Sequence, residues 1–177
     1  MDLMQQVWVG IDPGLTGAFA IIRGRDVQFV DMPTITVKAG KKNRKEYDAA
    51  AIVRILEQAS EAAITVTVAV ERQQAMPAGL KGATQGVVSV FRLGHGFGLL
   101  CGILAGLRMP YELVAPVSWK KSLMADAPKD KGASIIAACR LFPHAACDLR
   151  RKKDHARSDA LLIAEYARRR QFALAGQ

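Results

Sequence analysis

The sequence has few cysteines, no long hydrophobic run and a shortage of acidic residues. The cysteines Cys101, Cys139 and Cys147 are odd in number and lack metal-type spacing, which argues against a disulfide framework and predicts reduced, buried thiols in a cytosolic protein. The longest apolar run, residues 97–107, is far short of the ~20 residues that span a bilayer. The N-terminal residues lack the cationic start and long apolar core of a signal peptide. We therefore expect a protein that is neither secreted nor transmembrane.

The shortage of acidic residues leaves a large positive excess. Of the 177 residues, 25 are Lys or Arg and 16 are Asp or Glu, which gives a net charge of +9. A basic chain of this size favours a polyanionic partner, such as nucleic acid or an acidic membrane surface. Half of the residues (50%) are hydrophobic, enough for one domain to build a core without disulfides.

Short β-branched runs followed by longer helical periodicities predict one α/β domain. We expect strands at residues 7–12, 18–22, 27–30, 65–70 and 111–114, and helices at 46–63, 84–108, 117–124, 131–142 and 154–170. Residues 33–44 are interpreted as a basic connector. No repeat or linker divides the chain, so we expect a single domain over 1–170 and a flexible tail over 171–177.

Four glycines recur at steps of four within the longest expected helix, residues 84–108: Gly94, Gly98, Gly102 and Gly106. Each glycine costs roughly 1 kcal/mol relative to alanine in a helix interior. Their spacing therefore predicts that another backbone approaches this face closely. That backbone would belong either to the same subunit or to the helix of a second copy.

Acidic residues stand at the ends of otherwise apolar elements. Asp12 ends the first strand and Glu71 ends the fourth, so parallel pairing of these strands would bring both to the carboxyl edge of the sheet. Asp159 lies in the first turns of the last helix, with His155 four residues earlier on the same face. Asp154 fits a helix N-cap better than a ligand. Taken singly, Asp12 fits a turn and Glu71 a solvated strand end. Together these residues predict a site for Mg²⁺ or, with an imidazole ligand, Mn²⁺.

Basic residues cluster near the expected metal site and elsewhere on the surface. We expect these cations to hold a phosphodiester backbone, which positions nucleic acid without reading its sequence. They are Lys41, Lys42 and Arg44 in the connector, Lys120 and Lys121, Lys131, and Arg150, Arg151, Lys152 and Lys153 directly before the last helix.

Three segments that carry these residues resemble a known family. Residues 10–18, Gly-Ile-Asp-Pro-Gly-Leu-Thr-Gly-Ala, resemble the first motif of RuvC-type Holliday junction resolvases in the RNase H-like superfamily. Residues 68–71 are similar to their second motif and residues 152–164 to their last. The similarity is closer to the plastid and phage-type branches than to the standard bacterial enzyme, and the order and spacing match over nearly the whole chain.

The resemblance implies an RNase H-like fold, with a five-stranded mixed sheet flanked by helices on both faces. It also implies a homodimer with two Mg²⁺ ions per active site, Mn²⁺ also supporting activity, and Asp12, Glu71 and Asp159 as the carboxylates. The implied reaction is paired, symmetric nicking of four-way DNA junctions that leaves 5′-phosphate and 3′-hydroxyl ends. Ala156 stands where the bacterial enzymes carry another acid, so His155 is the nearest substitute and Asp154 the alternative.

The resemblance implies further contacts and leaves alternatives open. Lys120 and Lys131 match phosphate-binding lysines, and Gln73 or Met76 in the turn after Glu71 is positioned to probe unstacked bases. The substrate could also be flaps, forks or RNA–DNA hybrids, and a catalytically silent junction-binding protein is the non-enzymatic alternative. An actin-like ATPase or sugar kinase would need a second, duplicated domain. The expected location is a bacterial or phage-infected cytoplasm, or an organellar nucleoid.

Overall fold

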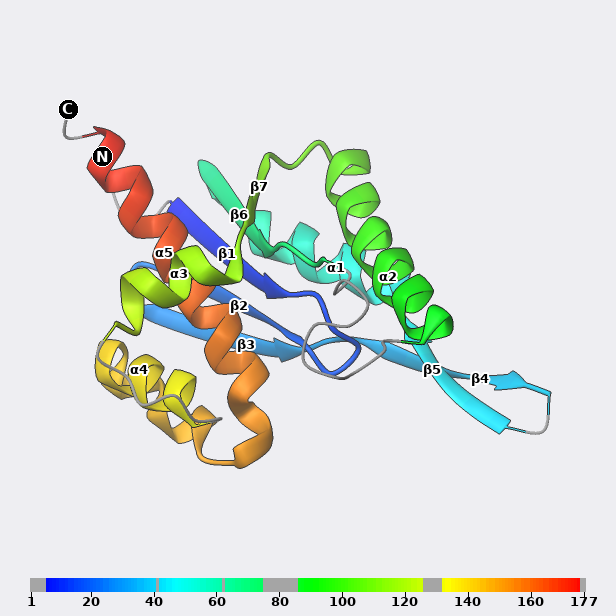
Figure 1. Cartoon of the computed structure of the whole chain (residues 1–177). Helices are drawn as coiled ribbons and strands as arrows, with labels where there is room; N and C mark the ends of the chain where they lie inside the picture. The colour runs from blue at the N-terminus through cyan, green and yellow to red at the C-terminus, as the bar shows by residue number, and fades with distance from the viewer. Residues whose placement is uncertain (1–5, 41, 62, 75–85, 126–131, 176–177) are drawn as a thin grey trace.

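A mixed five-stranded sheet forms the centre of the computed structural model, which describes residues 6–40, 42–61, 63–74, 86–125 and 132–175 (Figure 1). The strand order is β3-β2-β1-β6-β7. The strands are β1 (Gln6–Asp12), β2 (Ala18–Arg23), β3 (Asp26–Asp31), β6 (Thr65–Glu71) and β7 (Tyr111–Val114). β6 pairs in parallel with both β1 and β7, whereas β2 is antiparallel to β1 and β3. The predicted fold class is confirmed.

Helices cover both faces of this sheet (Figure 1). Alternate β1 side chains enter separate cores, so Val7, Val9 and Ile11 pack on one face and Trp8 on the other. The helices α1 (Ala49–Ser60) and α2 (Val87–Gly106) cover the first face, and α3 (Pro116–Leu123), α4 (Ala133–Leu141) and α5 (His155–Ala175) cover the second. The short 3₁₀ helices η3 (Pro143–Leu149) and η4 (Lys152–Asp154) lead into α5.

The segment interpreted as a connector is a two-stranded antiparallel ribbon. Its strands β4 (Thr34–Ala39) and β5 (Lys42–Tyr47) extend away from the main sheet (Figure 1). Gly40 takes the positive φ (62°) that the turn requires. The connector prediction was wrong because β-branched residues dominate Thr34–Ala39, a composition typical of a strand. Asp48 then caps α1 by accepting from the Ala51 nitrogen at 2.9 Å, so the helix begins at 49 rather than 46.

One close backbone approach fixes α5 against β1. A Cβ added to Gly10 would overlap the Ala160 carbonyl oxygen and lie 2.5 Å from the Ala164 nitrogen. Only glycine therefore allows this helix to lie so near the strand. Since β1 ends in Asp12 and α5 carries Asp159, this contact determines how the two acids are placed.

The last helix extends beyond residue 170, where the expected domain ends. α5 continues to Ala175. The Trp8 indole donates a hydrogen bond to Gln171 Oε1 at 2.9 Å, and the Trp8 and Phe172 ring centroids lie 5.8 Å apart. Residues 176–177 lie outside the described residues. The prediction of buried thiols fails for Cys147, which is exposed.

The glycines of α2 face open space. Among the residues that the structure describes, a Cβ added to Gly94, Gly98, Gly102 or Gly106 would have no heavy atom within 4 Å beyond its own chain neighbours and local helix backbone. The alternative of close packing within the subunit is therefore wrong. α2 also has 20 residues and a mean hydropathy of 1.7, with 17% of its most apolar window buried. By length and composition it could span a bilayer, so the apolar segment is longer than the 97–107 run suggested.

Candidate active site

Asp12 and Glu71 lie side by side at the carboxyl edge of the sheet. The parallel register pairs Ile11 with Val70, so each acid is the next residue on its own strand. Neighbouring strands are about 4.8 Å apart. The pairing predicted from the sequence is therefore present.

Two polar residues at the start of α5, Asp159 and His155, lie close enough to interact electrostatically with Asp12. Burial, together with the negative charges of Glu71 and Asp159, raises the pKa of Asp12 to about 6, against smaller lowering effects from Gly14 and His155. The Gly14 N–H donates to Asp12 Oδ1 at 3.4 Å. Both causes follow from the placement of the carboxylates, which lie close together and are largely shielded from water.

Glu71 has two hydrogen-bond donors that fix its carboxylate. The Trp119 indole donates to Oε1 at 3.1 Å, and the Gln73 amide donates to Oε2 at 3.3 Å. Burial raises the pKa of Glu71, although the Trp119 hydrogen bond and the Lys120 charge oppose this. Trp119 is fully buried, so its indole holds one carboxylate oxygen in a fixed direction.

Asp159 is supported by different groups. Burial raises its pKa, while a hydrogen bond from Ser134 and the charges of Lys120 and His155 lower it. His155 is exposed and its Nδ1 lies 3.3 Å from the Lys152 carbonyl oxygen. With the proton on Nδ1, this carbonyl accepts it and Nε2 is left free to accept a proton or bind a cation.

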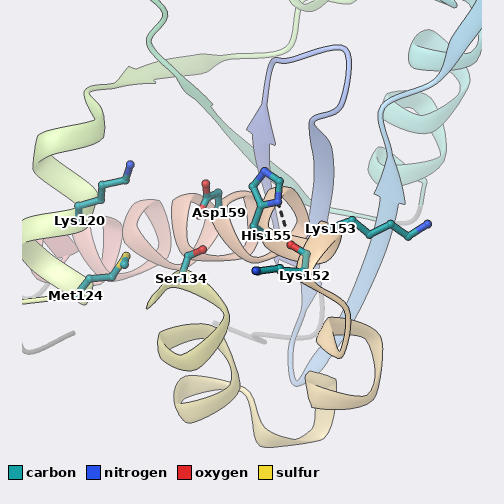
Figure 2. A pocket seen from close by; sticks show the side chains of 7 residues that line it. All are labelled: Lys120, Met124, Ser134, Lys152, Lys153, His155 and Asp159. Atoms are coloured by element: carbon teal, nitrogen blue, oxygen red, sulfur yellow. Dashed lines mark hydrogen bonds between the residues drawn. The ribbon is translucent and has the colours of Figure 1, made fainter. Parts of the chain in front are cut away.

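A cavity of about 640 Å³ opens beside Asp159. Figure 2 shows Asp159 between Lys120 on α3 and His155 at the start of α5. The lining residues combine one acid with several cations: Lys120, Met124, Ser134, Lys152, Lys153, His155 and Asp159. Such a cavity can take an anionic group next to the carboxylates.

Asp154 has a structural role in η4 rather than a role as a metal ligand beside these acids. It is 3% exposed and accepts from the Arg151 backbone nitrogen at 2.8 Å and from the Arg151 guanidinium at 2.8 Å. The Arg151 hydrogen bonds lower the pKa of Asp154. Its oxygens are thus occupied in capping η4, which leaves His155 as the better candidate ligand.

The acidic residues fit a divalent cation in their chemistry. Asp12, Glu71 and Asp159 are hard oxygen donors, and the mutual repulsion that raises the Asp12 pKa would be relieved by positive charge between them. Among the residues that the structure describes, no three acidic, histidine or cysteine side chains form a ready-made metal cage. The three acids are neighbours, and binding of a cation would require their carboxylates to move closer together.

The predicted basic residues are placed unevenly. Lys120, Lys152 and Lys153 line the cavity, whereas Lys42 and Arg44 lie on β5, away from it. Lys121 and Arg150 are exposed, and Arg151 is engaged by Asp154. Lys41, Lys131 and Met76 lie outside the described residues. Gln73 donates to Glu71, which differs from the role of probing bases.

Three residues of the site were missed at the level of sequence. They are Trp119, Ser134 and Tyr47, whose hydroxyl donates to the Pro13 carbonyl at 2.8 Å. The pKa of Tyr47 is raised by burial and by the Asp12 charge, so the ring lies near the acids. The one signal available was Trp119 itself. A large apolar ring in a short helix that is otherwise mostly polar is expected to face the core.

Comparisons with known proteins point to one fold. No protein-family model matches the chain. A 66-residue segment is 41% identical to the chloroplastic Holliday junction resolvase MOC1 of Chlamydomonas reinhardtii, and this match covers 37% of the chain but 8% of that protein.

Two solved structures of RuvC cover almost the whole chain. Thermus thermophilus RuvC in complex with a Holliday junction substrate has a TM-score of 0.57 at 15% identity, covering 93% of this chain and 96% of that one. A second Thermus thermophilus RuvC structure has a TM-score of 0.52 at 17% identity, with the same coverage of 93% and 96%. The chain thus has the fold of RuvC, and the resemblance to RuvC-type resolvases is supported.

Proposed function

We propose that this protein is a Holliday junction resolvase, a metal-dependent endonuclease that nicks four-way DNA junctions symmetrically. The observation that carries the proposal is the group of three mutually repelling carboxylates on a RuvC fold, next to a cavity lined by lysines. The partial similarity to a plastid resolvase supports it. Because that relative is chloroplastic, it favours an organellar nucleoid as the location, and a bacterial or phage-infected cytoplasm is the alternative.

We propose that Asp12, Glu71, Asp159 and His155 hold two Mg²⁺ ions, with Mn²⁺ as a substitute. When bound, such ions activate a water and stabilise the charge on the phosphate and on the leaving 3′ oxygen. Asp12 interacts with both of the other acids, so it is the candidate to be shared between the ions. Trp119 and Ser134 orient the carboxylates of Glu71 and Asp159.

The remaining residues of the cavity act on protons and on the substrate backbone. His155 Nε2 is free to accept a proton when Nδ1 donates to the Lys152 carbonyl. Lys120 lies near both Glu71 and Asp159, where its charge would also attract the scissile phosphate. Attack of water on the phosphorus with departure of the 3′ oxygen would leave a 5′-phosphate and a 3′-hydroxyl.

We propose that the DNA arms lie over the surrounding cations. Lys152 and Lys153 would neutralise phosphates at the cavity, and Lys42 and Arg44 would contact an arm farther away. Lys41, Lys121, Lys131 and Arg150 complete the set expected from the sequence. Contacts of this kind supply affinity and register but no base specificity.

A Mg²⁺-dependent cleavage assay tests the proposal. The substrates are a four-way junction, a Y-fork, a flap, a linear duplex and an RNA–DNA hybrid, each labelled on every strand. We expect paired nicks, symmetric across the junction, and little cleavage of the others. Preferred cutting of flaps, forks or hybrids would favour a different branched substrate, and tight junction binding without cleavage would favour a silent binding protein.

Paired nicks require two active sites, so we propose that the functional form is a homodimer. The exposed glycine face of α2, with Val87 85% exposed at its start, is the surface we assign to the second copy. Open glycines allow two helices to approach closely.

We expect Gly98→Glu to convert the dimer to a monomer, because it places a charge on that face. The substitution has open space in the monomer and replaces a poor helix former, so it should not unfold the chain. Sedimentation equilibrium measures the mass, with Ala50→Glu on the exposed side of α1 as the control. An unchanged dimer in Gly98→Glu would place the interface elsewhere.

Trp119→Phe should lower cleavage while leaving the fold intact. Phenylalanine keeps most of the buried ring volume but removes the donor to Glu71, so the carboxylate loses its fixed direction. A misplacement of about 1 Å can cost on the order of a hundredfold in rate, and we expect a loss of tenfold or more. The half-saturating Mg²⁺ concentration should rise as well, which a purely packing role would not cause. Wild-type rate and metal dependence in this variant would refute a role in orienting Glu71.

Activity should fall as the pH drops through about 6. The pKa of Asp12 is raised to about 6 by burial and by Glu71 and Asp159, with His155 opposing, and protonation removes its negative charge. Protons then compete with the cation, so a tenfold higher Mg²⁺ concentration should move the lower limb of the rate profile to lower pH. A limb that stays fixed across Mg²⁺ concentrations would mean that a group outside the metal site controls it.

A further inference from the structure

A tyrosine that the proposed reaction does not use lies behind the loop that follows Asp12. Tyr47 is the last residue of β5, where the ribbon meets α2 (Figure 1). Its hydroxyl donates a hydrogen bond to the Pro13 carbonyl oxygen at 2.8 Å. The hydroxyl is therefore bound to the residue next to Asp12, the acid that we propose to be shared between the metal ions.

The peptide group that Tyr47 contacts also contacts the Asp12 carboxylate. The Pro13 carbonyl and the Gly14 N–H are the two polar ends of one peptide group, which is planar and trans, so they point in opposite directions. The Gly14 N–H donates to Asp12 Oδ1 at 3.4 Å. One rigid plane thus joins the Tyr47 hydroxyl on one side to the Asp12 carboxylate on the other.

The hydrogen bond to Asp12 depends closely on the orientation of this peptide group. Its distance of 3.4 Å exceeds the usual range of about 2.7–3.2 Å, so a small rotation of the peptide would break it. Gly14 has no side chain to restrict that rotation. Gly17 donates to the Gly14 carbonyl at 2.8 Å, but this bond holds the following peptide group. Within the described residues no second donor to the Pro13 carbonyl is found, so the Tyr47 hydroxyl sets the direction of the Gly14 N–H.

The position of Tyr47 is itself fixed from two sides. At the base of the ribbon the residue pairs with Thr34. On the other side, a Cβ added to Gly96 would overlap the Tyr47 ring, so α2 packs directly against this ring. Gly96 is buried, whereas Gly94 and Gly98 face open space on another side of the helix. A second copy bound to the open glycine face would therefore leave the contact between Gly96 and Tyr47 in place.

We propose that Tyr47 is a positioning residue for the metal site, which holds the Asp12 carboxylate in its metal-binding direction through the peptide group between Pro13 and Gly14. This inference rests on the proposed function, because it assigns Tyr47 a role at the same site. A carboxylate shared between two cations must point toward both, so free rotation would weaken the binding of each. Removing a group that orients a metal ligand typically lowers metal affinity roughly 10- to 100-fold.

Amide hydrogen exchange of the full-length protein in EDTA, followed by NMR, tests the link without metal or DNA. Tyr47→Phe removes the hydroxyl but keeps the ring that packs on Gly96, so the variant should fold. We expect the Gly14 amide to exchange about tenfold faster, because its peptide group is no longer held. The Ala51 amide donates to Asp48 Oδ1 at 2.9 Å and should exchange as in wild type, so it is the internal reference.

Mn²⁺ binding in the absence of DNA gives a second readout. Electron paramagnetic resonance measures the free Mn²⁺, and we expect Tyr47→Phe to raise the dissociation constant roughly tenfold. Junction affinity in EDTA should equal that of wild type. Tyr111→Phe is the matched control, because it removes a hydroxyl that also contacts α2, at Cys101, from the end of β7 farthest from Glu71. This control should match wild type in every measurement.

The outcomes separate this inference from the proposed function. An unchanged Gly14 amide in Tyr47→Phe overturns the inference, even where cleavage is slow. Equal acceleration at Gly14 and Ala51 also overturns it, since that result indicates a general loosening of the chain. Wild-type Mn²⁺ affinity in the variant would show that Tyr47 does not orient a metal ligand. Junctions that the wild-type protein neither binds nor cuts overturn the proposed function instead, and the Gly14 amide still tests the contact with Tyr47.

Discussion

Asp12→Asn should abolish junction cleavage, leave junction binding intact and stabilise the metal-free fold. Asn has nearly the same shape as Asp and can still accept the Gly14 N–H hydrogen bond. It lacks the negative charge that a shared cation would need. Loss of about 4 kcal/mol of transition-state stabilisation corresponds to a rate at least about a thousandfold lower.

The stabilisation follows from the raised pKa of Asp12. The folded-state pKa is about 6, against 3.8 for the ordinary carboxyl, so the folded chain holds a proton that the unfolded chain has lost between these values. Stability of the metal-free wild type therefore falls as pH rises from about 4 to 6, by up to ~3 kcal/mol. Asn carries no charge, so the variant should lack this loss and melt at a higher temperature than wild type at pH 8.

Cleavage, junction binding and thermal melting in EDTA give three independent readouts. Asp26→Asn is the matched control, because Asp26 is an exposed acid at the far edge of the sheet, in β3. It should cut, bind and melt as wild type does. If Asp12→Asn cut junctions at the wild-type rate, Asp12 would not be a metal-binding residue. If it melted below wild type in EDTA, the acid would instead have a stabilising structural role.

The sequence contained enough information to find the acids but not the groups that orient them. Asp12 and Glu71 could be predicted because each directly ends an apolar strand, and strand ends on one edge follow from parallel pairing alone. The Trp119 hydrogen bond to Glu71 could not, because it depends on how α3 packs against the sheet. Its partner is 48 residues away, and nothing local to Trp119 specifies that distance.

The glycines show the same limit in another form. Their regular spacing made Gly94 and Gly98 conspicuous, yet both have open space beside them. Close approaches between parts of the chain far apart in sequence occur at Gly10 and Gly96, which belong to no repeating pattern. The spacing of glycines along a helix predicts only which residues share a face of that helix. Whether another backbone packs closely on that face depends on the tertiary structure.

Gly10→Ala should be among the most damaging single-methyl changes in this protein. The added Cβ would overlap the Ala160 carbonyl and lie 2.5 Å from the Ala164 nitrogen, and both atoms belong to the backbone of α5. Backbone cannot rotate away as a side chain can, so the helix must shift. Overpacking of this kind costs ~3 kcal/mol or more, which corresponds to a melting temperature lower by about 6–12 °C for a chain of this size.

The loss of activity should exceed the loss of stability, because the shift separates the acids. Asp159 precedes Ala160, so a helix pushed outward carries it away from Asp12, and ~1 Å of misplacement can cost a hundredfold in rate. Cleavage should therefore be measured well below the melting point, with the folded fraction confirmed by circular dichroism. Gly86→Ala is the control, since its Cβ would meet no heavy atom of the described residues within 4 Å and its φ of −60° suits alanine. A Gly10→Ala variant that is folded and fully active would mean that β1 and α5 do not jointly position Asp12 and Asp159, and the proposed metal site would then have to be built from other residues.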